Sequence, residues 1–159
     1  MKPYNILFLC THNSARSVLG EVLASTHSSG KFKGFSAGST PGTSIHPIAA
    51  DIAESLGVER ALLKSKSWDV YAVPEAPKMD FIITVCDNAA AEQCPFWAGH
   101  PATAHWGFPD PSQVQGTDIE KRQAFNDVMQ GLKRRLDILA AMPLEQLDSM
   151  RLKAIHTQV

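Results

Sequence analysis

The 159-residue chain is predicted to fold as a single α/β domain with a parallel sheet covered on both faces. Short, continuous apolar runs of the kind found in strands buried on both sides alternate with segments of helical periodicity. Repeats, low-complexity tracts and interdomain linkers are absent from the sequence. We therefore assign residues 1–159 to one domain.

Four segments are predicted as strands. Tyr4–Leu9 and Phe81–Val85 are apolar without alternation, which fits central strands. Phe32–Ala37 is a shorter strand that ends at Gly38, and Thr103–Trp106 has the weakest pattern of the four. In a parallel sheet, ligands bind beyond the carboxyl ends of such strands.

Three helices are predicted between and after these strands. Ser14–Ser25 and Ser44–Leu56 carry apolar residues on one face, and Gly57 suits the C-terminal cap of the second. The third opens at Thr117–Glu120, which has the spacing of a capping box, and ends before Pro143.

The charge balance argues against a nucleic-acid partner or an anionic membrane surface. The chain has 15 basic and 16 acidic residues, for a formal net charge of -1. Its one basic cluster, Lys133–Arg135, is interpreted as a solvated helix face. No signal peptide is evident, and no apolar stretch approaches the roughly 20 residues that span a bilayer. We expect a cytoplasmic monomer, in a compartment where thiols stay reduced.

The junction between the first strand and the first helix has the pattern of an anion site. Cys10 ends the strand, and Arg16 lies where the helix begins. The intervening backbone N–H groups can turn inward, and the helix start adds partial positive charge. The oxyanion-binding residues expected here are Thr11, His12, Asn13, Ser14, Ala15 and Arg16.

The same environment favours a nucleophilic thiolate. Positive charge lowers the pKa of the Cys10 thiol, and Ser17 can donate a hydrogen bond to the thiolate. Arg16 can bind a tetrahedral oxyanion through two donors at once. Asn13 tolerates the left-handed backbone that a tight loop needs. His12 is either a polar loop residue or an acid–base partner, and the simpler alternative for the motif is a buried cysteine with an unrelated arginine.

A proton donor is predicted in the stretch HWGFPDPS. Asp110 is held between Pro109 and Pro111, in a loop that also carries Trp106 and Phe108. Apolar surroundings are expected to raise the pKa of this carboxyl and keep part of it protonated for a leaving oxygen. The alternative is an ordinary Asp-Pro turn.

Two further cysteines, Cys86 and Cys94, stand eight positions apart in VCDNAAAEQCP. If residues 87–93 form a helix, that spacing corresponds to a rise of about 12 Å. A disulfide needs Cα atoms within about 7 Å, so the two can pair only if the segment bends or unwinds. The segment is either a redox switch or a place where two unrelated cysteines occur.

Three motifs, CTHNSARS, VCDNAAAEQCP and HWGFPDP, resemble those of arsenate reductases built on the low-molecular-weight tyrosine phosphatase fold. The resemblance implies a four-stranded parallel sheet flanked by helices. It also implies arsenate reduction for arsenical resistance: Cys10 attacks arsenate with Asp110 as proton donor. Cys86 then attacks Cys10 and releases arsenite, and Cys94 attacks Cys86, which leaves a redox-active Cys86–Cys94 disulfide.

The resemblance also suggests partners for the chain. Thioredoxin is the expected reductant of the disulfide, with glutathione/glutaredoxin as the alternative, because the cysteine spacing is one residue longer than in thioredoxin-coupled members. No tightly bound cofactor is expected. Some relatives hold a potassium ion behind the loop, and its ligands would correspond to Asn13, Glu21, Ser36 and Asp69 here. Otherwise Glu21 is simply a polar helix residue.

The alternative activity is that of a phosphatase acting on phosphotyrosine or small phosphate esters. The same loop would bind phosphate or sulfate as mimics of arsenate. Tyrosine phosphatases of this fold usually place an aromatic residue just after the Asp-Pro, whereas Ser112 and Gln113 follow here. An oxyanion-binding sensor is a third possibility, but it would not need Cys10, Asp110 and a resolving cysteine pair together.

Overall fold

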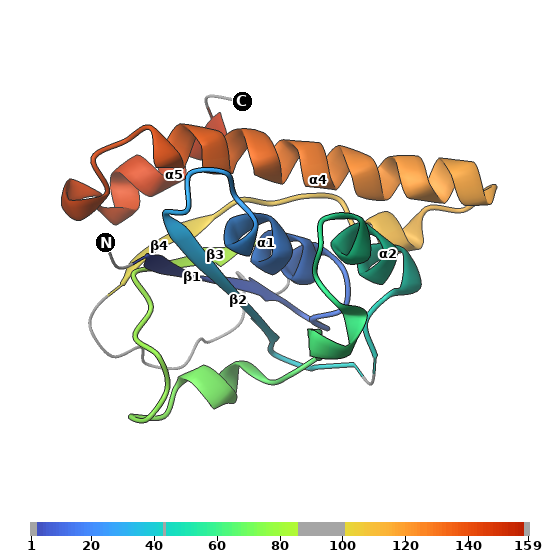
Figure 1. The fold of residues 1–159 in the computed structure, drawn as a ribbon, viewed down its shortest axis with the longest axis horizontal. Helices are drawn as coiled ribbons and strands as arrows, with labels where there is room; N and C mark the ends of the chain where they lie inside the picture. The colour runs from blue at the N-terminus through green and yellow to red at the C-terminus, as the bar shows by residue number, and fades with distance from the viewer. Residues whose placement is uncertain (1–2, 43, 86–100, 158–159) are drawn as a thin grey trace.

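The computed structural model describes residues 3–42, 44–85 and 101–157 of the chain (Figure 1). Four parallel strands form one sheet in the order β2-β1-β3-β4. Their bounds are β1 Tyr4–Cys10, β2 Phe32–Gly38, β3 Phe81–Thr84 and β4 Ala102–His105. The four predicted strands are therefore confirmed, with ends that differ from the prediction by one residue.

The loop after β1 lies at the topological switch point of the parallel sheet. β1 lies between β2 and β3, so the chain moves to one side of β1 first and to the other side later. Cys10 pairs with Gly38 of β2, and Leu9 pairs with Thr84 of β3. Cys10 therefore ends a central strand at the kind of crevice where α/β sheets bind ligands.

α-Helices cover one face of this sheet, and a segment with a short 3₁₀ helix covers the other. The helix bounds are α1 Arg16–Ser25, α2 Pro47–Ser55, α4 Asp118–Ala140 and α5 Ser149–Thr157. α1, α4 and α5 lie together on one side of the strands (Figure 1). The segment 64–79, with the short 3₁₀ helix η2 (Trp68–Tyr71), lies on the other, whereas the short 3₁₀ helix η1 (Arg60–Leu62) contacts α2.

Alternate side chains of β1 pack into two different hydrophobic cores, which explains why its sequence is apolar throughout. Ile6 and Phe8 pack into the core beneath the helices. Leu7 and Leu9 pack in a second core with Trp68 of η2. Both faces of the strand are buried, as the continuous apolar run predicts.

The predicted starts of the first two helices were too early. α1 begins at Arg16 because Ser14 and Ala15 belong to the loop before it. α2 begins at Pro47, where proline suits the first helical position. Its N-cap is His46, whose Nδ1 accepts a hydrogen bond from the Ile48 N–H at 3.1 Å.

The third predicted helix is confirmed, and the last helix was missed. Thr117 and Glu120 form the expected capping box at the start of α4. α5 is short, and Leu152 and Ile155 are its two fully buried residues, which is too little periodicity to detect. Within the described residues, no helix has the length and apolar character needed to cross a bilayer.

One part of the basic cluster on α4 contradicts the sequence prediction. Lys133 and Arg134 are exposed, as expected of a solvated face. Arg135 instead lies in the interior, with 7% of its surface exposed. Helical periodicity explains the difference, because Arg135 falls between the buried Leu132 and Leu139 on the core-facing stripe.

Close packing of α1 on β2 depends on Gly34. A methyl group at this position would lie 2.2 Å from the Glu21 carbonyl oxygen and 2.8 Å from the Glu21 Cα. Both atoms belong to backbone, so the clash cannot be relieved by a side-chain rotation. Gly34 therefore sets the distance between β2 and the helix that follows the anion loop.

We expect Gly34→Ala to destabilise the fold by about 1–3 kcal/mol, because α1 must move away from the sheet. Gly42→Ala is the matched control, since a methyl group there would meet its nearest neighbour, the His12 carbonyl oxygen, at an ordinary 3.7 Å. Urea unfolding of the two variants measures the difference. Equal stabilities would mean that the α1–β2 approach is not constrained by Gly34.

Candidate active site

The loop between β1 and α1 makes a tight turn around its centre. Cys10 is buried at the end of β1, with 5% of its surface exposed. Asn13 adopts a left-handed backbone with φ of 51°, the one positive φ among the described non-glycine residues. The conformation that the sequence predicted for Asn13 is thus confirmed, and it turns the chain back toward the start of α1 at Arg16.

In this loop, backbone carbonyl groups form hydrogen bonds with other described residues, whereas a run of N–H groups does not. Four loop carbonyls accept N–H bonds from the segment after β2, from Ser39 to Cys10, Thr40 to Thr11, Gly42 to His12 and His46 to Ser14. Across the described chain, the N–H groups of residues 12–16 donate to no protein atom. A run of unpaired N–H groups at a helix start is suited to bind an anion.

Asn13 also holds the loop in place through its side chain. Its Nδ2 donates to Ser17 Oγ at 2.9 Å, and its Oδ1 accepts from the Lys66 N–H at 3.0 Å. Asn13 and Ser17 are both fully buried. Because Ser17 Oγ accepts the hydrogen bond in this pair, the Ser17 hydroxyl proton remains available to donate to the Cys10 thiolate, as the sequence predicts.

The Arg16 guanidinium is anchored by one edge and leaves the other open. Nη1 donates to the Phe108 carbonyl at 2.8 Å, and Nη2 lies 3.6 Å from Asp110 Oδ2. Nε is buried and has no hydrogen-bond partner among the described residues. A buried donor without a partner is costly, so the Nε and Nη2 edge is suited to receive two oxygens of an anion.

Asp110 lies beside Arg16, but its ionisation differs from the prediction. Its Oδ1 accepts from the Ser112 N–H at 2.9 Å and the Ser112 hydroxyl at 2.7 Å. Burial alone would raise the pKa of Asp110, but these bonds and the charge of Arg16 outweigh burial and lower the pKa. The expected raised pKa is therefore wrong, and the carboxyl is ionised before an anion binds.

His12 is held by the segment that follows β2. Its Nδ1 lies 3.1 Å from the Thr40 carbonyl oxygen, which only accepts, so Nδ1 carries the proton. The His12 carbonyl also accepts from the Ser65 hydroxyl at 2.7 Å. These contacts fit the interpretation of His12 as a polar loop residue.

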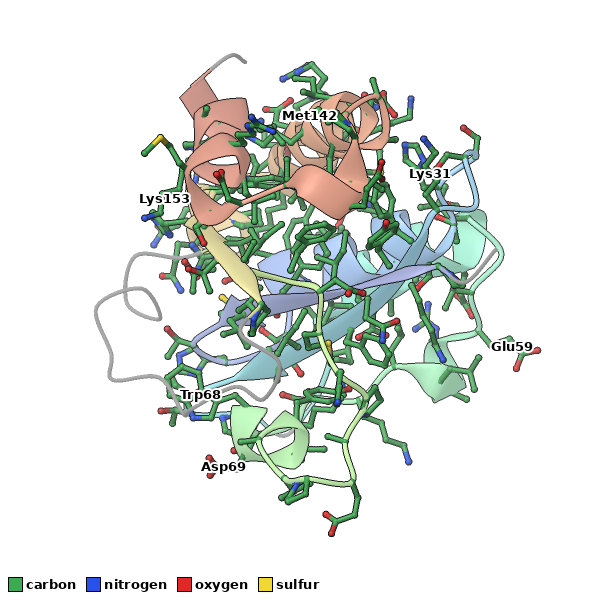
Figure 2. The ribbon with its side chains drawn as sticks, turned by 90° about the vertical axis from the view of Figure 1, so that its left-hand side faces the viewer. Lys31, Glu59, Trp68, Asp69, Met142 and Lys153 are labelled. Atoms are coloured by element: carbon green, nitrogen blue, oxygen red, sulfur yellow. The ribbon has the colours of Figure 1, made fainter. Side chains whose placement is uncertain are left out.

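The residues considered for potassium are only partly brought together. Ser36 donates to Glu21 Oε1 at 2.6 Å, and the Lys66 ammonium lies 3.9 Å from the same oxygen. Asn13 Oδ1 is already occupied by the Lys66 N–H, and Asp69 is exposed on η2 at the rim of the molecule (Figure 2). A cation of the protein thus lies beside Glu21, and the set does not fit a potassium cage.

Burial perturbs both partners of that internal contact. It raises the pKa of Glu21, against the opposing effects of Ser36 and Lys66. It lowers the pKa of Lys66, against the opposing charge of Glu21. Each partner therefore opposes the shift that burial produces in the other, and no step of the chemistry below depends on a metal ion.

Cys86 and Cys94, which the sequence suggests as a resolving pair, and the helix considered for residues 87–93 lie outside the described residues. Val85, which precedes Cys86, donates its N–H to the Leu9 carbonyl at 2.9 Å. Leu9 in turn precedes Cys10. The backbone at Val85 is therefore hydrogen-bonded to the residue next to the buried cysteine.

Two contributors to the site carry no signal in the sequence. Phe108 accepts the Arg16 hydrogen bond through its main-chain carbonyl, a contact that its side chain does not predict. Lys66 acts through its backbone N–H on Asn13 and its ammonium beside Glu21, and it is one of several lysines in a segment without periodicity. Only the contact across the fold identifies either residue.

Among the described residues, a buried cysteine, backbone N–H groups without partners and an arginine anchored on one side form an arrangement suited to bind a tetrahedral anion. The chain belongs to the low molecular weight phosphotyrosine protein phosphatase family, whose model matches residues 5–152. It is similar to an arsenate reductase of Bacillus subtilis, with 32% identity over 131 residues that cover 82% of this chain and 91% of that protein.

Two solved structures agree with this fold. An arsenate reductase from Archaeoglobus fulgidus has a TM-score of 0.65 and 21% identity, over 86% of this chain and 99% of that one. A thioredoxin-dependent arsenate reductase from Corynebacterium glutamicum has a TM-score of 0.60 and 20% identity, over 91% of this chain and 64% of that one. At these identities, the likeness concerns the fold.

We expect Arg16→Lys to weaken phosphate binding by roughly 10- to 100-fold, although the charge is retained. A lysine ammonium lacks the planar fork that lets the guanidinium bind the Phe108 carbonyl on one side and two anion oxygens on the other. Calorimetric titration with inorganic phosphate measures the loss. Arg122→Lys is the control, because Arg122 is exposed and pairs with Asp118 and Asp51 on the surface. An unchanged dissociation constant for Arg16→Lys would contradict the assignment of the open edge.

Proposed function

We propose that this chain reduces arsenate to arsenite, with Cys10 as the nucleophile. The observation that carries the proposal is the buried Nε of Arg16, which has no hydrogen-bond partner among the described residues and lies beside the N–H groups of residues 12–16, which likewise donate to none of them. Arsenate is a tetrahedral oxyanion that can accept from all of these donors. The similarity to curated arsenate reductases supports arsenate over other tetrahedral anions.

The first step joins sulfur to arsenic. The Cys10 thiolate attacks the arsenic atom, an S–As bond forms, and one As–O bond breaks. Asp110 is ionised in the resting site, so it must first take up a proton, and arsenate brings protons with it at neutral pH. The negative charge of the anion offsets the positive charge of Arg16. The pKa of Asp110 therefore rises, which favours this proton transfer. Asp110 then passes the proton to the leaving oxygen.

The second step moves two electrons from sulfur to arsenic. Cys86 attacks the Cys10 sulfur, the S–As bond breaks, and arsenic leaves as arsenite with the bonding pair. Cys94 then attacks Cys86, which restores the Cys10 thiolate and leaves a Cys86–Cys94 disulfide. The Val85–Leu9 hydrogen bond supports Cys86 as the thiol that attacks Cys10, because it holds the chain before Cys86 next to the strand that ends at Cys10.

An external thiol reductant must then supply two electrons to reduce the disulfide. We propose thioredoxin for this role, with glutathione/glutaredoxin as the alternative. One solved structure of this fold is described as a thioredoxin-dependent arsenate reductase, which supports the first choice. The cycle needs reduced thiols at its start, and this suits the cytoplasm.

A phosphatase activity is the second candidate, because the family is described by that activity and phosphate fits the same donors. Phosphoryl transfer would end with water hydrolysing the Cys10 adduct and would need neither resolving cysteine. Ser112, which follows the Asp-Pro, donates both of its hydrogen bonds to Asp110 and offers no aromatic surface to a phenolic substrate. We therefore expect weak phosphatase activity only.

Cys86→Ser and Cys94→Ser should each abolish multiple-turnover arsenate reduction and spare p-nitrophenyl phosphate hydrolysis. The two should stop at different points. One turnover of Cys94→Ser should leave a Cys10–Cys86 disulfide, whereas Cys86→Ser should leave the arsenic adduct on Cys10 unresolved. Mass spectrometry of trapped species and arsenite production with thioredoxin measure both.

The phosphatase assay is the internal control, since it reports an intact Cys10 site in each variant. Cys10→Ser should lose both activities. If Cys86→Ser and Cys94→Ser both sustain arsenite production with a protein reductant, the relay is wrong and the phosphatase becomes the better assignment.

A further inference from the structure

A buried arginine with no carboxylate partner among the described residues lies behind the anion site. Arg135 is on the core-facing side of α4 with 7% of its surface exposed. Among the described residues, no Asp or Glu forms an ion pair with it, and burial followed by the charge of Arg134 lowers its pKa. An unpaired buried cation is costly, so its retention calls for a local reason.

Arg135 is instead satisfied by neutral groups. Its Nη1 donates to the Gly131 carbonyl at 2.7 Å, and its Nε donates to His156 Nδ1 at 2.9 Å. His156 comes from α5, so this bond joins the last two helices. The guanidinium also stacks over the Phe108 ring, with 4.7 Å from Cζ to the ring centroid.

Phe108 is enclosed by this pair. The His156 ring meets it edge-on, with 6.1 Å between centroids. Gly131 leaves the space that the ring occupies, because a methyl group there would lie 2.7 Å from Phe108 Cε1. Arg135, His156 and Gly131 thus fix the Phe108 ring from three sides.

The position of Phe108 determines the geometry of the anion site. Its carbonyl accepts the Arg16 Nη1 bond at 2.8 Å, and its N–H donates to the Val85 carbonyl at 3.1 Å. Asp110 follows two residues later, with Pro109 and Pro111 limiting its backbone. A shift of Phe108 would therefore move both the anchor of Arg16 and the carboxylate beside it.

We infer that Arg135 and His156 are a pair of positioning residues that act through Phe108 to hold Arg16 and Asp110 in the geometry that binds the anion. The inference concerns the site of the proposed function. Its test uses sulfate binding, so it can fail while arsenate reduction stands, and the reverse.

The pair depends on a neutral His156. Nδ1 must be unprotonated to accept from Arg135, and a proton there would place two cations in contact. Arg135 of α4 and His105 of β4 face His156 from the elements packed against α5. Burial, then Arg135 and His105, lowers the pKa of His156. On α5 itself, Lys153 is exposed three residues earlier (Figure 2). Acidification should therefore break the pair.

The test compares sulfate dissociation constants by calorimetry on the full chain with reduced thiols. Arg135→Met and His156→Leu should each weaken sulfate binding by roughly three- to tenfold. His156→Gln should stay near the wild type, because an amide oxygen can accept from Arg135 Nε. Arg134→Met is the matched control, since Arg134 is exposed on the same helix and should change nothing.

Two readouts separate positioning from simple stability. Arg135→Met replaces an unpaired buried cation by an apolar side chain, so urea stability should hold while sulfate affinity falls. Between pH 7.5 and 5, sulfate keeps its charge, and wild-type affinity should fall more than that of His156→Gln, which cannot take the proton.

The inference is overturned if folded His156→Leu and Arg135→Met bind sulfate as tightly as the wild type. Parallel pH profiles of wild type and His156→Gln would overturn it as well. Should Arg135→Met fail to fold, the His156→Leu and His156→Gln comparison decides by itself.

Discussion

The hydrogen bond from Arg16 Nη1 to the Phe108 carbonyl joins two loops that are 92 residues apart. Everything proposed for the site depends on it. It commits Nη1 to the Phe108 carbonyl and leaves the edge formed by Nε and Nη2 available to an anion. It also places Asp110 Oδ2 3.6 Å from Nη2. Without this anchor, Arg16 would be a flexible cation at a helix start rather than a rigid receptor for an oxyanion.

The backbone of the loop before Arg16 is likewise divided between groups that are hydrogen-bonded within the protein and groups that remain available to an anion. Buried N–H and C=O groups must find partners, and here the carbonyls find them in the segment after β2. The N–H groups of residues 12–16 donate to no other described residue, which leaves them available to a ligand. The left-handed Asn13 makes this division possible, and its side chain ties the loop to Ser17 and to the backbone of Lys66. The anion site is thus assembled before the anion arrives.

The sequence could predict the parts of this account that depend on local pattern. Continuous apolar runs located all four strands, and the spacing from Cys10 to Arg16 at a strand–helix junction located the loop. What it could not supply depends on contacts across the fold. Arg135 belongs to a basic run that looks solvated, and only the helical phase buries it. The pKa of Asp110 was misjudged because Ser112 and Arg16 outweigh its burial.

The central claim is that this junction holds Cys10 as a thiolate in a preformed anion site. The most direct measurement is the pKa of Cys10, taken from the pH dependence of thiolate absorbance in a Cys86→Ser, Cys94→Ser double variant, where it is the only cysteine left of three. The account predicts a pKa well below that of an exposed cysteine peptide, and an upward shift when sulfate fills the site. A pKa at or above the peptide value, unmoved by sulfate, would contradict it.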